Sequence, residues 1–197
     1  SLKVKEWTPA EYARYNSLEK PLDEEKTSVL QLLKKAPRTF WTVGLVQFFC
    51  WAAFMYMWTY TTGSVADTCW GVNMQLTTAT STPQYQEAGN WVGILFAVQA
   101  IGSVVWAVVL PQIRSRKMAY SLSLLLGAVG FAWVPFVHDP YVMFLPFILI
   151  GCAWAAMLAM PFTFVTNALE GKGHMGAYLG LFNGTICVPQ IIAAAGG

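Results

Sequence analysis

The side chains that could bind a ligand inside this apolar chain are amides and indoles rather than charged groups. Gln47, Trp51 and Trp58 stand at positions i, i+4 and i+11. On a helix this spacing places all three on one face. A buried amide without a hydrogen-bond partner costs free energy, so Gln47 must contact protein, water or a ligand. We therefore expect this face to bind a polar molecule without a net charge.

More amides and indoles occur further along the chain. Asn183 and Gln190 are seven residues apart and share a helix face. Amides pair with hydroxyl groups as donors and as acceptors, and an indole stacks on the apolar C–H face of a sugar ring, so a sugar is the favoured ligand. Each residue has a structural alternative, because aromatics also face lipid and amides also join neighbouring helices. The candidate substrate-binding residues are Gln47, Trp51, Trp58, Gln99, Trp154, Asn183 and Gln190.

The residues that catalysis or metal binding would need are not grouped in the sequence. The four cysteines form no C-x-x-C pair and no His/Cys cluster. His138, His174, Asp67 and Glu87 lie at the edges of apolar runs, and the runs between them contain no Asp, Glu, Lys or Arg. The sequence therefore predicts that the protein is not an enzyme and has no resident cofactor or metal. If the chain belonged to an ion-coupled carrier, a proton or a sodium ion would be the coupling ion, and its carboxylate would lie in another part of that carrier.

Long apolar runs must position these residues. The chain is 56% hydrophobic and 11% charged, whereas a soluble domain has about 25% charged residues. A membrane-spanning helix needs about 20 apolar residues. We therefore predict an all-α polytopic integral membrane protein whose residues 39–197 form a bundle in lipid. Its helices are expected at about 39–61, 89–112, 118–137, 141–167 and 175–197, the last of them incomplete.

The 12 basic residues predict the orientation of this bundle. Eight lie within residues 1–38, a second group is Arg114, Arg116 and Lys117, and Lys172 stands alone. Lys and Arg mark the cytoplasmic side of a membrane protein, so residues 1–38 are expected to be cytoplasmic. Within that segment, capping-box patterns predict short amphipathic helices starting after Thr8 and Ser28. Because the basic residues flank apolar runs, the predicted partners are the lipid bilayer and a small solute, and not nucleic acid.

Small residues and prolines predict where the helices pack closely and where they bend. Gly130 and Gly151 each lie in a row of small residues along one face of a predicted helix. Such rows favour close helix contacts in membranes. Pro146, Pro161 and Pro189 are expected to interrupt their helices.

Several of these motifs resemble a transporter family. The basic segment from Arg114 to Lys117 resembles the cytoplasmic loop signature of the major facilitator superfamily, in a degenerate form without its Gly and Asp. Residues 171–190 resemble the Gly-rich loop and eleventh helix of its sucrose-transporter-like branch, the glycoside–pentoside–hexuronide:cation symporters and their relatives. Pro161, after a run of small residues, resembles the tenth helix of that branch, and the region of Trp51 resembles the seventh.

The resemblance covers residues 39–197 and implies the C-terminal six-helix bundle of a twelve-helix carrier, with helices seven to eleven present. Residues 1–38 would be the central cytoplasmic loop, and the missing N-terminal half would be a partner. By this resemblance Asn183, Pro189 and Gln190 belong to the eleventh-helix motif and Trp51 to the seventh helix.

The resemblance also implies a function, which is secondary active transport of a sugar (a di- or oligosaccharide or a glycoside) with a proton or cation. Alternating access would be the mechanism, and the bacterial inner membrane is the expected location. Two alternatives remain, namely a facilitator or exporter of another small solute on the same fold, and a membrane scaffold without transport.

Overall fold

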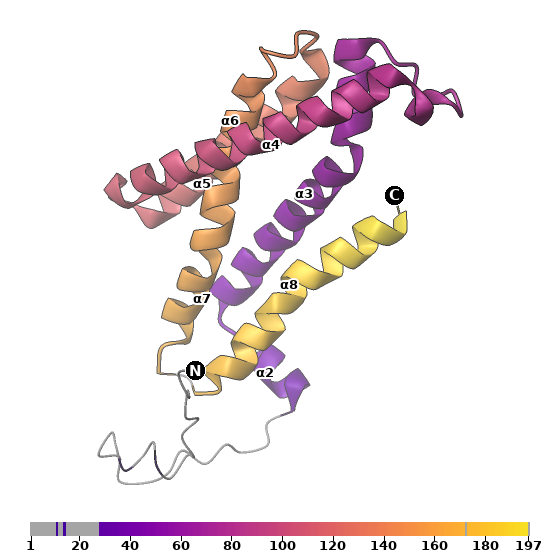
Figure 1. The fold of residues 1–197 in the computed structure, drawn as a ribbon. Coiled ribbons are helices and arrows are strands. Elements are labelled where there is room, and N and C mark those ends of the chain that lie inside the picture. Colours follow the sequence, from indigo (N-terminus) through magenta and orange to yellow (C-terminus); the bar gives the residue numbers. More distant parts are fainter. Residues whose placement is uncertain (1–10, 12–13, 15–27, 172, 197) are drawn as a thin grey trace.

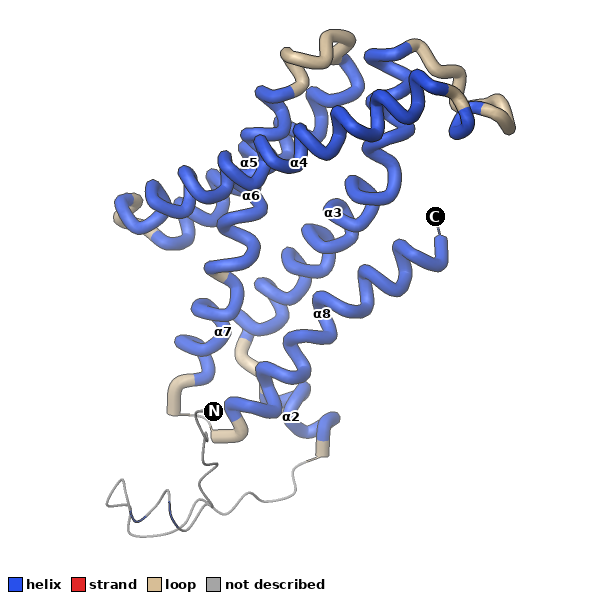
Figure 2. The backbone as a smooth tube through the Cα atoms, in the orientation of Figure 1, coloured by secondary structure: helices blue, strands red, loops and turns tan. Residues whose placement is uncertain are grey.

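A computed structural model describes residues 11, 14, 28–171 and 173–196 of the chain (Figure 1). All regular structure in these residues is helical, as the sequence predicts, and they contain no strand (Figure 2). Of the predicted helix after Thr8 only Glu11 and Arg14 are described, and both are helical; the rest of it lies outside the described residues.

Seven α-helices and three short 3-10 helices follow one another along the described chain. Five stretches are long and apolar enough to cross a membrane, namely α3, α4 with η2, α5 with η3, α6 with α7, and α8. Each contains or largely overlaps one of the five predicted spans. The elements are α2 Val29–Lys35, α3 Arg38–Trp70, η1 Ala79–Ser81, α4 Pro83–Val109, η2 Leu110–Gln112, α5 Arg116–Trp133, η3 Val134–Phe136, α6 Phe144–Ala159, α7 Pro161–Leu169 and α8 Met175–Gly196.

The loop between the first two spans is shorter than predicted. The helices predicted at about 39–61 and 89–112 leave the polar residues between them as a loop, but α3 continues until Gly71, whose φ of 64° ends the helix in the left-handed region. The next helix starts after Thr82, whose hydroxyl accepts a hydrogen bond from a backbone N–H three residues on. Asp67 and Glu87 therefore lie on helix ends, where both are exposed, and not in a loop.

Only one of the three prolines expected to interrupt a helix does so. The break between α6 and α7 falls at Met160 and Pro161, as predicted. Pro146 lies in the first turn of α6, where a missing N–H removes no helical hydrogen bond. Pro189 lies inside a continuous α8, as membrane helices tolerate. The prediction was therefore wrong at Pro146 and Pro189.

The short helix α2 packs against the base of the bundle. It begins after Ser28, as expected, but the Ser28 side chain makes no capping hydrogen bond, so the predicted capping box is wrong there. Leu32 of α2 is buried in a cluster with Phe40 of α3, Leu169 of α7 and Tyr178 of α8. This cluster joins α2 to the ends of three longer helices.

Helix α6 lies between α4 and α5, and glycines allow the close approach. A Cβ atom added to Gly151 would overlap the backbone carbonyl oxygen of Gln99 in α4, and one added to Gly130 would lie 2.6 Å from the carbonyl oxygen of Pro146. The close packing predicted for Gly130 and Gly151 is thus confirmed.

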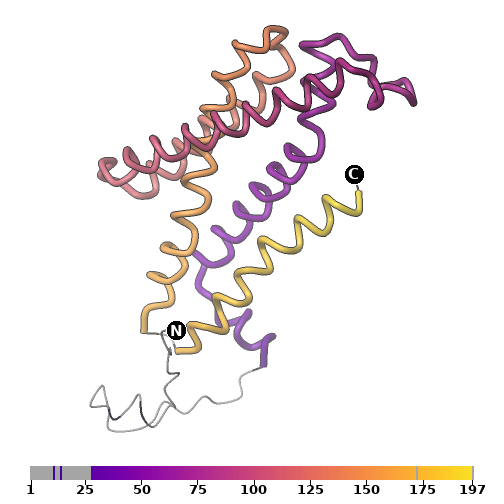
Figure 3. Tube along the Cα trace, in the orientation of Figure 1, coloured from indigo at the N-terminus to yellow at the C-terminus, as the bar shows by residue number. Residues whose placement is uncertain are grey.

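The remaining spans form a second group around α3. Helices α3 and α8, far apart in the sequence, run side by side (Figure 3). A Cβ atom on Gly44 of α3 would lie 3.0 Å from the Thr185 methyl carbon of α8. Helix α7 also packs against α3, so the span broken at Pro161 contacts α4 and α5 with its first part and α3 with its second.

Candidate functional site

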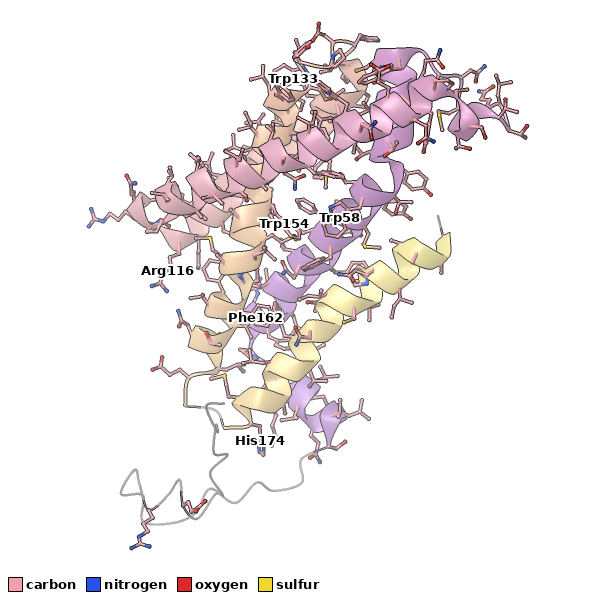
Figure 4. The ribbon with its side chains drawn as sticks, in the orientation of Figure 1. Trp58, Arg116, Trp133, Trp154, Phe162 and His174 are labelled. Atoms are coloured by element: carbon pink, nitrogen blue, oxygen red, sulfur yellow. The ribbon has the colours of Figure 1, made fainter. Side chains whose placement is uncertain are left out.

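Three predicted tryptophans meet where α3 faces α6. Trp51 and Trp58 come from α3, and Trp154 comes from α6; Figure 4 labels Trp58 and Trp154. The Trp154 ring centroid lies 5.7 Å from that of Trp51 and 5.5 Å from that of Trp58, both in edge-to-face geometry. We call these three residues the indole cluster. Trp58 is 41% exposed, and the other two are half-buried, so part of the cluster can still be covered by a ligand.

Two phenylalanines, Phe54 of α3 and Phe131 of α5, pack beneath the indole cluster. Phe54 is 2% exposed and its ring centroid lies 4.9 Å from that of Trp154. Phe131 of α5 contacts Phe54 at 5.5 Å. These contacts hold the indole rings in place because buried aromatic rings in van der Waals contact have little freedom to rotate.

Gln47 lies one turn before Trp51 on the same face of α3 and is 1% exposed. Its Nε2 donates a hydrogen bond to the backbone carbonyl oxygen of Met157 in α6, at 3.3 Å. This carbonyl would normally bond the N–H four residues later, but that residue is Pro161, which has none. The Nε2 atom of Gln47 therefore joins two neighbouring helices, which is the structural alternative to ligand binding. It donates to a carbonyl that has no helical N–H partner.

Two polar atoms beside the indole cluster have no hydrogen-bond partner among the described residues. They are Oε1 of Gln47 and Nε1 of Trp51, and both are buried. One is an acceptor and the other a donor, and they project from successive turns of α3. A buried polar atom without a partner carries a desolvation cost of about 1–3 kcal/mol. A hydroxyl-bearing ligand or water that bonded either atom would remove that cost.

The other predicted amides are not joined to this site by any hydrogen bond that the described residues show. Gln99 is 6% exposed in the interface of α4 with α6, where its backbone packs on Gly151 and its Oε1 lacks a partner. Asn183 is exposed and Gln190 half-buried on α8. The buried stripe of α8 includes Phe182, so both amides lie away from the face that contacts α3.

The predicted basic residues lie at a different level of the bundle. Arg114 follows η2, and Arg116 and Lys117 begin α5. Figure 4 shows Arg116 away from Trp58 and Trp154. A cavity of about 470 Å³ opens beside Arg114 and Arg116, against the break between α6 and α7. A second, of about 410 Å³, opens between α3, α5 and α7.

Sequence reasoning missed two features of these regions. The free carbonyl of Met157 could have been found by counting four residues back from Pro161. Tyr120 gave no such signal, because it follows a basic loop and resembles an ordinary interfacial aromatic residue. Its hydroxyl is buried without a hydrogen-bond partner in the described part of the chain. Within the same residues, no group of three His, Cys, Asp or Glu side chains could hold a metal ion.

Comparison with known families supplies one match. The family model described as Major Facilitator Superfamily matches residues 5–194. No curated protein and no solved structure matches the chain.

Proposed function

The chain belongs to the major facilitator superfamily, and from this premise we propose which solute it carries and how. The superfamily consists of membrane transporters, so this is an integral membrane transport protein with a small-molecule substrate. We propose that the substrate is a sugar, such as a di- or oligosaccharide or a glycoside, moved with a proton or cation by alternating access.

The observation that carries the sugar proposal is the indole cluster beside two unpartnered polar atoms. Trp51, Trp58 and Trp154 offer ring edges and faces to the C–H surface of a sugar. Oε1 of Gln47 is a hydrogen-bond acceptor and Nε1 of Trp51 is a donor, and both lack a partner among the described residues. A sugar hydroxyl can donate to the first or accept from the second. No charged side chain contacts this group in the described residues, which favours a neutral solute over an ionic one.

The five spans would correspond to helices seven to eleven of a twelve-helix carrier. We propose that α3 and the α6–α7 span line the transport path, with Gln99, Asn183 and Gln190 as further contacts once the carrier closes around its solute. The coupling carboxylate would lie outside these spans, because their central parts carry no charged side chain. The end that carries Arg114, Arg116 and Lys117 would face the cytoplasm of a bacterium.

Uptake into proteoliposomes tests this proposal. The carrier is reconstituted, and entry of a labelled disaccharide is measured with and without a proton or sodium gradient. We expect gradient-dependent uptake that unlabelled disaccharide blocks and that Trp154→Ala reduces about tenfold or more, because the variant removes the ring that makes edge-to-face contact with both Trp51 and Trp58. Trp133→Phe is the control, since Trp133 is 39% exposed at the end of α5 and lies away from the cluster (Figure 4).

Different outcomes separate the alternatives. Disaccharide uptake that depends on neither the proton nor the sodium gradient indicates a facilitator. Uptake of an unrelated solute that disaccharides do not inhibit indicates a carrier of that solute. A protein that moves no solute and whose thermal stability no solute changes is a scaffold. An equal loss of uptake in Trp154→Ala and Trp133→Phe would show that the indole cluster does not bind the solute.

A further inference from the structure

The cavity of about 410 Å³ between the first turns of α3 and α5 and the side of α7 is polar at one end and apolar at the other. We propose that it binds one acidic phospholipid, with the phosphate at the basic end and the start of the acyl chains at the apolar end. The residues that line it are Arg38, Thr39, Thr42, Val43, Val46, Lys117, Tyr120, Ser121 and Phe164.

Two cations from different helices face this cavity. Arg38 begins α3 and Lys117 lies in the first turn of α5, and both are exposed. Neither forms an ion pair with a carboxylate of the described residues. A guanidinium binds two phosphate oxygens at once and an ammonium adds a second charge. The pair therefore suits a phosphate group, and Lys34 and Lys35 of α2 add positive charge in the segment that leads into α3.

Tyr120 provides the second, independent observation. Its side chain lines the cavity one turn beyond Lys117 and is only 8% exposed. Its hydroxyl is buried and has no hydrogen-bond partner among the described residues. The ring lines the cavity while the hydroxyl is covered, so an acceptor that enters past the charged end and reaches this hydroxyl would supply its missing partner. The ester carbonyl oxygens of a phospholipid lie on the acyl-chain side of its phosphate and supply such an acceptor, whereas a free phosphate does not extend beyond the cations.

The order of residues along α3 matches a lipid from headgroup to chain. Arg38 is followed by Thr42 one turn later and by Val46 after another turn, a total rise of about 12 Å. Across the cavity, Phe164 of α7 adds an aromatic wall. Charge, then hydroxyl groups, then apolar surface is the sequence of groups met on passing from a phosphate to the first methylene groups of a lipid. This gradient favours a phospholipid over a soluble anion.

Native mass spectrometry of the purified chain tests the site. The chain is titrated with phosphatidylglycerol and, separately, with phosphatidylcholine, and bound lipid is counted. We expect one tightly retained phosphatidylglycerol and weaker retention of phosphatidylcholine. Lys117→Gln should weaken phosphatidylglycerol binding about fivefold, and Tyr120→Phe should do so about two- to tenfold through loss of one hydrogen bond.

Arg116→Gln is the matched control, because it removes the same charge one residue away but lines the other cavity. We expect it to retain phosphatidylglycerol like the parent chain, and circular dichroism melting verifies that all three variants fold. Four results would each overturn the proposal, namely an equal loss in Arg116→Gln, an unchanged Tyr120→Phe, equal retention of phosphatidylcholine, and displacement of the lipid by millimolar inorganic phosphate. The last result would indicate a site for a soluble anion.

Discussion

The hydrogen bond between Gln47 and Met157 predicts an energetic coupling between two residues that are far apart in the sequence. Gln47 donates to the Met157 carbonyl, which receives no backbone N–H from Pro161 four residues later. If Pro161 becomes alanine and the helix closes across the break, residue 161 can bond that carbonyl itself. Loss of the Gln47 amide should then cost less. The four proteins needed are the parent, Gln47→Leu, Pro161→Ala and the double variant.

The structure sets the size of the coupling. A hydrogen bond between membrane helices contributes about 0.5–2 kcal/mol, and the 3.3 Å separation lies at the long end of the usual range. We therefore expect a coupling free energy of about 1 kcal/mol. Gln47→Leu alone loses this bond but also removes the unpartnered Oε1 atom, whose burial costs about 1–3 kcal/mol. The single variant should thus range from near neutral to about 2 kcal/mol more stable, and the cycle rather than the single change measures the bond.

Thermal unfolding in detergent measures the cycle. For a chain of this length, about 1 kcal/mol corresponds to a change in Tm of about 2–4 °C. Gln47→Leu should raise Tm more in the Pro161→Ala background than in the parent, by that amount. Additive changes in Tm would refute the reasoning, since they would mean that Gln47 does not replace the donor that Pro161 lacks.

Three further predictions concern packing and access. Gly151→Ala should lower Tm by about 2–12 °C, because overpacking costs about 1–3 kcal/mol. Gly93→Ala, with open space around it, should leave Tm unchanged or raise it, and equal shifts in the two variants would contradict the α4–α6 contact. Trp106→Phe should lower Tm by about 2–4 °C through loss of the 2.8 Å bond from Nε1 to the Ser123 hydroxyl, and an unchanged melt would show that this bond adds nothing. Cys187 is exposed on the α8 face that carries Asn183 and Gln190. A membrane-impermeant maleimide should therefore label this thiol in proteoliposomes, and substrate should protect it from labelling. Absence of labelling would show that this face does not line a water-filled path.

The sequence predicted the features that depend on spacing within one helix. Gln47, Trp51 and Trp58 share a face of α3 because their separations match the helical period. It did not predict which residue would receive the Gln47 amide, since that depends on how closely α3 approaches α6. The stripe of α8 that packs on α3 was also hidden, because nearly every position of that helix is apolar and periodicity alone does not distinguish its faces. It also did not predict that α3 continues over residues 62–70, because the polar composition of this segment indicates a loop.

The neutrality of the membrane-spanning helices has a consequence for the electrical work of transport. On these helices every charged side chain that the structure describes lies near a helix end, as Arg38, Asp67 and Lys117 do. Moving one elementary charge through the whole membrane potential takes about 2.3 kcal/mol per 100 mV, whereas tilting a bundle whose middle is neutral takes almost none. Movement of these five spans should therefore contribute little gating charge, and any voltage dependence of transport must come from the coupling ion or from charges outside these spans.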